Sequence, residues 1–156
     1  MKSICLKING EKSRVDVRAH WSLAYAIREK VGLTGTKTCC EMGTCGSCTV
    51  LLDGLPVFSC LKMAVDAEDQ EITTIEGLER NGKLHPLQQA FIEDHGMQCG
   101  ICTPGMIIAA KALLDENANP TEREVREAIG GHLCRCGTYT RIVKSILHAA
   151  EIARNS

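Results

Sequence analysis

Short apolar runs separated by turn signals fill the first half of the chain, a pattern typical of a β-sheet. The runs that predict strands are Ile4–Ile8, Val15–Val17, Thr49–Leu52 and Ile72–Ile75. Asn9-Gly10 and Asp53-Gly54 are two-residue hairpin signals between apolar runs. The first predicts a turn between strands one and two, and the second predicts a turn between strands three and four.

One helix interrupts this strand pattern. Ser22 is a good N-cap, and Gly32 suits the end of the helix because glycine readily adopts positive φ. The apolar residues of one predicted face are Leu23, Ala26, Ile27 and Val31. A hairpin, a helix and a second strand pair predict an α+β sheet with the helix packed across it.

After about residue 84 the pattern becomes helical. Pro86 and Pro104 each stand in the first turn of a predicted helix, and the second of these helices is apolar nearly all round, as expected of a buried helix. Thr121 with Glu124 forms a capping box that begins a third helix. Glycines end the first and third helices at Gly96 and Gly130-Gly131. A fourth helix carries Ile142, Ile146, Ala149 and Ala153 at helical spacing.

The joint between the two halves is expected between Glu76 and Lys83, where Gly77 and Asn81-Gly82 mark turns. With 156 residues in total, neither half alone has many apolar residues to spare for a core. The two halves should therefore support each other.

Composition argues against nucleic acid and membrane partners. The formal net charge is -1 and aromatic residues make up 3% of the chain, so neither a basic surface nor a base-stacking platform is expected. The first ten residues lack a signal-peptide core, and no later stretch is long enough to cross a bilayer. The sequence therefore predicts a cytoplasmic protein.

Cysteine is the compositional outlier, with ten in the chain. In a reducing compartment, clustered cysteines are more often metal ligands than disulfides. The first set is Cys40, Cys45, Cys48 and Cys60. Its spacing is that of a plant-type ferredoxin [2Fe-2S] cluster. Gly43 and Gly46 add the backbone freedom that a loop needs to wrap a compact inorganic core.

The second set consists of two close pairs, Cys99 with Cys102 and Cys134 with Cys136. Both pairs stand just ahead of predicted helices, so helix N-termini can face a negatively charged thiolate cluster. On spacing alone, these four cysteines fit either an iron-sulfur cluster or a tetrahedral zinc site.

The remaining candidates are weaker. Cys5 is interpreted as a small buried hydrophobe on a strand. Cys39 lies directly beside Cys40, but only Cys40 gives the four-residue gap to Cys45. The five histidines show no shared spacing, and His132 is the nearest candidate because it lies two residues before Cys134. Nucleophile, phosphate-loop and paired-carboxylate signatures are all missing from the sequence, which predicts no catalytic residue and no substrate site of its own.

Three motifs, in this order, resemble the xanthine oxidase family of molybdenum hydroxylases, specifically its small iron-sulfur subunit. They are Gly35-Thr36-Lys37-Thr38-Cys39-Cys40-Glu41-Met42-Gly43-Thr44-Cys45-Gly46-Ser47-Cys48-Thr49-Val50, Gln98-Cys99-Gly100-Ile101-Cys102-Thr103-Pro104-Gly105-Met106 and Leu133-Cys134-Arg135-Cys136. The resemblance spans essentially the whole chain and favours iron-sulfur over zinc for the second set.

The resemblance implies an α+β protein: a ferredoxin-like (β-grasp) domain over 1–78 and a four-helix-bundle [2Fe-2S] domain over 79–156. It also implies assembly with a large molybdopterin subunit and usually a flavin (FAD) subunit. Substrate is then hydroxylated on the partner with oxygen from water. Electrons would leave singly, first to the cluster of the second set, next to that of the first, and on to FAD or another acceptor. Gln98 would reach the pterin, and Cys136 would lie at the cofactor edge.

Departures from many relatives occur at Cys39, His132 and Gly137-Thr138, none of which is a predicted ligand. They do not select among purine, aldehyde, nicotinate-type heterocycle, carbon monoxide and aryl-CoA substrates. Two alternatives from other classes stay open. A freestanding ferredoxin shuttle accounts for the first cysteine set only, and a zinc-stabilised interaction module would use metal for folding without redox chemistry.

Overall fold

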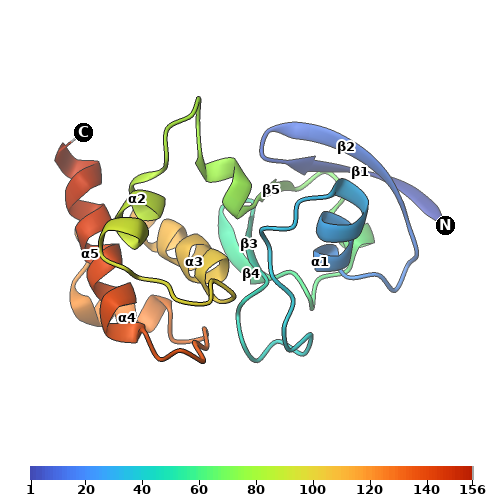
Figure 1. Ribbon diagram of the computed structural model, residues 1–156. Helices are drawn as coiled ribbons and strands as arrows, with labels where there is room; N and C mark the ends of the chain where they lie inside the picture. The colour runs from blue at the N-terminus through green and yellow to red at the C-terminus, as the bar shows by residue number, and fades with distance from the viewer. Residues whose placement is uncertain (156) are drawn as a thin grey trace.

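A five-stranded sheet organises the N-terminal half of the computed structural model, which describes residues 1–155 (Figure 1). Its strands are β1 (Lys2–Ile8), β2 (Glu11–Val17), β3 (Thr49–Leu52), β4 (Leu55–Phe58) and β5 (Glu71–Thr73). Their order across the sheet is β2-β1-β5-β3-β4, and only β1 with β5 is a parallel pair. Both predicted hairpins, at Asn9-Gly10 and Asp53-Gly54, are confirmed.

The sheet differs from the predicted strand pattern at two places. β4 is an edge strand whose side chains are exposed or half-buried, and it was predicted only through the Asp53-Gly54 turn, because Pro56 interrupts its short apolar run and suits an edge position. The predicted strand Ile72–Ile75 stops at Thr73, because the side-chain oxygen of Asn9 accepts the Thr74 N–H at 2.9 Å. Ile75 instead begins a 3₁₀ turn, η3 (Ile75–Leu78).

The helix predicted after Ser22 is present and packs against this sheet. Ser22 caps it by accepting the N–H of Tyr25 at 3.2 Å, and Gly32 ends it at φ 85°. One α-helical turn, α1 (Leu23–Tyr25), continues as a π-helical segment, η1 (Ala26–Val31). The predicted apolar face is confirmed, since Leu23, Ala26 and Ile27 are fully buried. A second 3₁₀ turn, η2 (Ala64–Ala67), closes the far side of this core.

Four helices form the C-terminal half and pack together as a bundle (Figure 1). They are α2 (Pro86–Glu93), α3 (Thr103–Glu116), α4 (Glu122–Ala128) and α5 (Tyr139–Asn155). Both first-turn prolines and the Thr121 capping box with Glu124 are confirmed. A second capping box, between His85 and Gln88 at the start of α2, has no Ser, Thr, Asp or Asn and was not predicted. Within residues 1–155, none of the helices is long and apolar enough to cross a membrane.

The chain has two apolar cores that meet at β3. One core lies between the sheet and α1, and the other lies among the four helices. Leu51 on β3 belongs to the helical core, whereas its neighbours Val50 and Leu52 belong to the sheet core, because side chains alternate across a strand. The two halves therefore support each other, as their size requires. The division into domains at 78/79 stays a prediction.

Asp94 connects the end of α2 to α5. Its carboxylate is 7% exposed and pairs with Lys144 at 2.7 Å and His148 at 2.6 Å. Burial opposes ionisation of Asp94, but hydrogen bonds from Lys144 and His148 outweigh it and hold the pKa below its usual value.

Replacing Asp94 should therefore loosen the bundle. We expect Asp94→Asn to lower the free energy of unfolding by about 1–3 kcal/mol at pH 7, since it removes a charged acceptor from a buried site. Because the folded-state pKa is depressed, this contribution is present above about pH 4 and is lost as the pH falls through the folded-state pKa. Denaturant unfolding at pH 7 and pH 3 measures this contribution.

Asp115→Asn, which breaks only the exposed pair with Lys111 on α3, is the control and should lower the free energy of unfolding by at most about 0.5 kcal/mol. Equal losses for the two variants would contradict this account.

Candidate metal centres

The first predicted ligand set lies in the loop between η1 and β3 and just after β4. Glu41, Gly43 and Gly46 have positive φ values of 53°, 76° and 72°, so the backbone curls back on itself repeatedly between Cys40 and Cys48. Cys60 is joined to this loop through its neighbour Ser59, whose hydroxyl donates to the Cys48 carbonyl at 2.6 Å. The structure thus brings all four cysteines of the set to one end of the sheet.

Backbone amides of this loop point at the sulfur of Cys40. The N–H groups of Met42, Thr44 and Cys45 lie 3.5, 3.3 and 3.4 Å from Cys40 Sγ. The amide of Met42, followed by that of Cys45, lowers the pKa of Cys40 to about 6. A thiolate, the form that binds metal, is therefore stabilised here by the protein itself.

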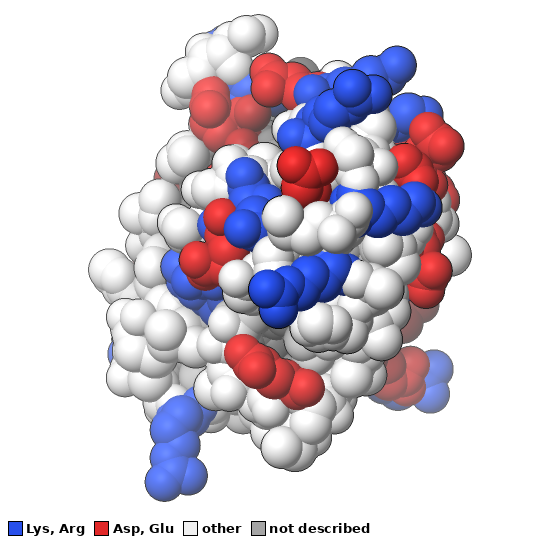
Figure 2. Space-filling model, turned by 90° about the vertical axis from the view of Figure 1, so that its right-hand side faces the viewer, with Lys and Arg blue, Asp and Glu red and all other residues white. Residues whose placement is uncertain are grey.

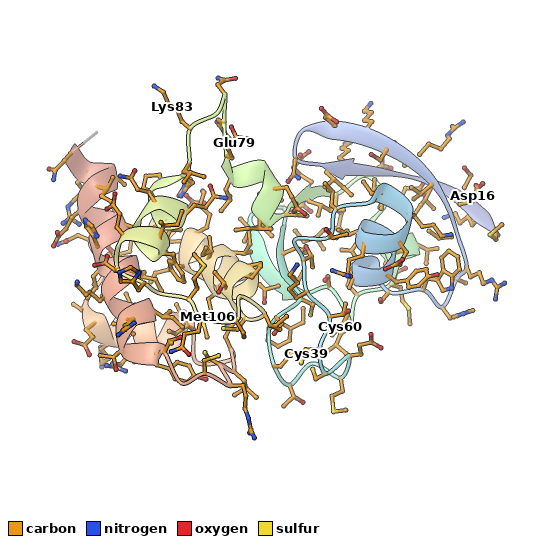
Figure 3. The ribbon with its side chains drawn as sticks, in the orientation of Figure 1. Asp16, Cys39, Cys60, Glu79, Lys83 and Met106 are labelled. Atoms are coloured by element: carbon orange, nitrogen blue, oxygen red, sulfur yellow. The ribbon has the colours of Figure 1, made fainter. Side chains whose placement is uncertain are left out.

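Cys39 is in a different situation from its neighbour. It is exposed, and its thiol also reaches Cys45. The charge of Cys45 is the largest of the effects that raise the pKa of Cys39 above its ordinary value. Figure 3 places Cys39 and Cys60 at the same end of the N-terminal half. Electrostatics therefore favours Cys40 over Cys39 as the ligand, in agreement with the spacing argument.

The second predicted set lies where two loops precede α3 and α5. Cys102 is the N-cap residue of α3, and Cys136 stands three residues before α5 begins at Tyr139. Gly100 and Gly137 turn the two loops at φ 84° and 71°. The predicted placement of both pairs ahead of helix N-termini is confirmed, so the positive ends of two helix dipoles face this site.

Tyr139 fixes the loop that carries Cys134. Its hydroxyl accepts the Cys134 N–H at 2.8 Å and donates to the His132 carbonyl at 3.1 Å. Thr138 adds a contact of 3.3 Å between its hydroxyl and Cys134 Sγ. Burial acts to raise the pKa of Cys134, but the hydrogen bonds from Thr138 prevail and lower it to about 7. Sequence reasoning missed Tyr139 and noted Thr138 only as a departure from many relatives, because no motif marks a hydroxyl that closes a loop.

The thiols within each site lie close enough to shift one another's pKa values. In the first site Cys40 interacts with Cys45, and Cys48 with Cys60. In the second site, the pairs are Cys99 with Cys136 and Cys102 with Cys134. Among residues 1–155, no group of three or more His, Cys, Asp or Glu side chains converges as a ligand set for one metal ion. Two thiols for each of two irons is the arrangement that a [2Fe-2S] cluster needs.

Three of the eight predicted ligands are buried: Cys45 and Cys48 in the first site and Cys102 in the second. Burial is the largest effect on Cys48 and on Cys102, and it raises their pKa values to about 11 and about 12. Cys99, in contrast, is exposed. Metal binding must therefore displace protons from the thiols of Cys48 and Cys102, while the donor set itself, four sulfurs per site, fits iron-sulfur chemistry.

The other candidates can also be placed. Gln98 is exposed and lies beside Cys99. Cys5 is half-buried on β1 rather than fully buried. His132 is 6% exposed and lies between the two sites, where Nε2 is 2.9 Å from Thr49 Oγ1. No sequence motif predicts this last contact, which joins residues 83 positions apart.

Two family models match the chain and together cover most of it. A 2Fe-2S iron-sulfur cluster binding domain matches residues 6–78, and a [2Fe-2S] binding domain matches residues 74–147. The first match contains Cys40, Cys45, Cys48 and Cys60, and the second contains Cys99, Cys102, Cys134 and Cys136.

Close relatives match over nearly the whole chain. The nicotinate dehydrogenase small FeS subunit of Eubacterium barkeri is 43% identical over 98% of both chains. The structure of quinoline 2-oxidoreductase from Pseudomonas putida 86 superposes with a TM-score of 0.94 at 48% identity, covering 99% of this chain and 97% of that one. Aldehyde oxidoreductase of Megalodesulfovibrio gigas is 43% identical over 94% of this chain, which corresponds to 16% of that longer protein.

The adjacent pair Cys39 and Cys40 offers a matched test of the ligand assignment. We expect Cys40→Ser to lose the first cluster, since it removes the thiol on which three amides converge. Cys39→Ser should keep iron and sulfide at the unaltered level. Chemical iron and sulfide analysis with visible absorption measures both. Loss of iron in Cys39→Ser with retention in Cys40→Ser would reverse the assignment.

Proposed function

We propose that this chain, which belongs to the small [2Fe-2S] subunits of the xanthine oxidase family of molybdenum hydroxylases, relays electrons between two partner sites. It is an electron-transfer subunit of an oxidoreductase. In our proposal, electrons arrive singly from a molybdopterin-bearing partner, pass through two [2Fe-2S] clusters, and leave to FAD or another acceptor.

The grouping of eight cysteines into two sets of four, each set within one of the two [2Fe-2S] domain matches, is the observation that carries this proposal. We assign Cys40, Cys45, Cys48 and Cys60 to one cluster, and Cys99, Cys102, Cys134 and Cys136 to the other. When bound, each cluster accepts one electron and passes it on. The protein contributes the thiolates, the amides directed at Cys40, and the helix N-termini behind Cys102 and Cys136. These groups stabilise negative charge at the sites.

Exposed apolar side chains beside each site support docking of partners there. Met97, Ile101 and Leu133 are 38%, 45% and 53% exposed and flank the second set. Met42 and Leu61, 71% and 60% exposed, flank the first. Apolar side chains gathered around a functional site are typical of protein interfaces.

We propose that the second set faces the large molybdopterin subunit, with Gln98 and Cys136 at the pterin edge, and that the first set faces an FAD subunit. The exposure of Gln98 fits this orientation, because its amide is open to a partner and can both donate and accept. In the aldehyde oxidoreductase of M. gigas, the matching region is joined covalently to a much longer remainder. That relationship supports a permanent partner.

A freestanding electron shuttle is the weaker alternative. Figure 2 shows the end of the molecule formed by the N-terminal half, where Lys and Arg are interspersed with Asp and Glu. The whole chain has a net charge of -1, so it provides little long-range attraction to a charged partner. A second cluster in a helical half also adds nothing to a protein that meets its partner by diffusion.

The substrate belongs to the partner rather than to this chain. Relatives named for nicotinate, quinoline and aldehyde are 43%, 48% and 43% identical to it, so the sequence of the small subunit does not follow the substrate. We place the complex in the cytoplasm, where unpaired cysteines persist. All ten cysteines of this chain are free of disulfides.

Cofactor content tests the relay directly. Two clusters of two irons each predict four iron and four sulfide per chain, and dithionite reduction should give two distinct S = 1/2 signals in low-temperature EPR. The protein should be purified anaerobically with its natural partners. A molybdenum signal in the same sample would support the partner assignment. Two irons with zinc, or a colourless protein, would leave the single-cluster ferredoxin or the zinc module.

The docking faces can be tested by charge substitution. We expect Leu133→Glu to reduce co-purification of the molybdenum-containing partner, because it places a carboxylate in a proposed apolar contact. Leu55→Glu alters a side chain of similar exposure, 62%, in the β3–β4 hairpin, and should leave co-purification unchanged. Iron content of the isolated subunit must stay normal in both variants. Full partner recovery with Leu133→Glu would exclude this face as the docking site.

A further inference from the structure

The two ligand loops are in direct contact with each other. The N–H of Leu133, next to Cys134, donates to the carbonyl of Cys45 at 2.9 Å. The contact is close because glycines face it. A Cβ on Gly105, in α3, would lie 2.4 Å from the Gly46 carbonyl oxygen, and one on Gly46 would lie 2.6 Å from the His132 ring. We call this contact region the seam, defined by Cys45, Gly46, Thr49, Gly105, His132 and Leu133.

His132 spans the seam with a directed hydrogen bond. Its Nε2 lies 2.9 Å from the hydroxyl oxygen of Thr49, at the start of β3. Thr49 has one hydroxyl proton, and it donates that proton to the Gly46 carbonyl at 2.6 Å. The Thr49 oxygen must therefore accept from His132, which places a proton on Nε2.

The surroundings hold the ring in this orientation. Phe58 meets it edge-on with the ring centroids 6.0 Å apart. Thr49 and His132 are 2% and 6% exposed, so water does not compete for the bond. Nδ1 has no hydrogen-bond partner among the described residues. The ring therefore has a single polar anchor, which is Thr49.

We propose that His132 is a positioning residue that fixes the spacing and orientation of the two cluster sites by donating to Thr49. This inference rests on the proposed function, because it requires both clusters. Thr49 follows Cys48 directly and His132 precedes Cys134 by two residues, so their hydrogen bond joins one ligand loop to the other. Small displacements at this point change the geometry between the sites, on which passage of an electron between them depends.

Variants can distinguish a hydrogen-bonding role of His132 from a role in packing alone. His132→Leu keeps an apolar group but removes the donor, whereas His132→Gln places an N–H donor near the former Nε2 and loses the ring. Thr49→Val removes the hydroxyl with almost no change of shape, and Thr49→Ser keeps it. Gln88→Leu is a control, because Gln88 donates to the Ile75 carbonyl at 3.3 Å and so joins the two halves away from the ligand loops.

The measurement is the magnetic interaction between the two reduced clusters, recorded by EPR on the anaerobically purified full chain with whatever binds it. We expect His132→Leu and Thr49→Val to keep both S = 1/2 signals and iron content but to change the spin–spin splitting. His132→Gln, Thr49→Ser and Gln88→Leu should show the unaltered splitting. The double variant His132→Leu/Thr49→Val should match Thr49→Val, because loss of the Thr49 hydroxyl removes the bond to His132 together with the bond to the Gly46 carbonyl.

Each other outcome has a definite meaning. An unaltered splitting in Thr49→Val overturns the inference, and so does His132→Gln behaving like His132→Leu, because packing then suffices. If His132→Leu fails to assemble its clusters, the near-isosteric Thr49→Val decides alone. A wild-type chain without two EPR signals refutes the proposed function itself, whereas two signals with no effect at position 49 refute only the role of His132.

Discussion

Bringing four thiolates together is the electrostatic constraint on which the rest of this structure depends. The first site meets it with backbone amides, three of which converge on Cys40 Sγ, and the second with helix N-termini behind Cys102 and Cys136. Neither loop could hold its shape alone. The first loop is held between η1 and β3, and Tyr139 closes the second onto α5. The two apolar cores therefore hold the elements from which the cysteine-bearing loops extend.

The same constraint gives each site an inner and an outer side. Cys48 and Cys102 are buried, and the helix that begins after Cys102 places Gly105 against the carbonyl of Gly46. Cys99 is exposed among apolar side chains. Among the proposed ligands, the buried ones therefore lie toward the seam and Cys99 lies at the surface.

Local signals in the sequence predicted local structure well. All the features that depend only on neighbouring residues are present. They are the two hairpins, the Ser22 cap, the Thr121 capping box, and the helices that begin just after the two cysteine pairs of the second set. Edge strand β4 was predicted only through the Asp53-Gly54 turn, and the π-helical geometry of η1 was missed because Ala26, Ile27 and Val31 have the apolar spacing of an ordinary α-helix. Tyr139 and the pair of Thr49 with His132 depend on contacts made by tertiary folding, for which one sequence carries no signal.

The choice between Cys39 and Cys40 shows how the two kinds of argument differ. Spacing selected Cys40 by comparison with a known pattern, without giving a reason why a thiol one residue away would not serve. The structure supplies the reason: amide N–H groups lower the pKa of Cys40, whereas the charge of Cys45 raises that of Cys39. In this loop the backbone amides favour the thiolate of Cys40 over that of Cys39, whereas burial raises the pKa values of Cys48 and Cys102. A spacing motif therefore records where the loop can direct its amides, and it constrains backbone geometry as much as residue identity.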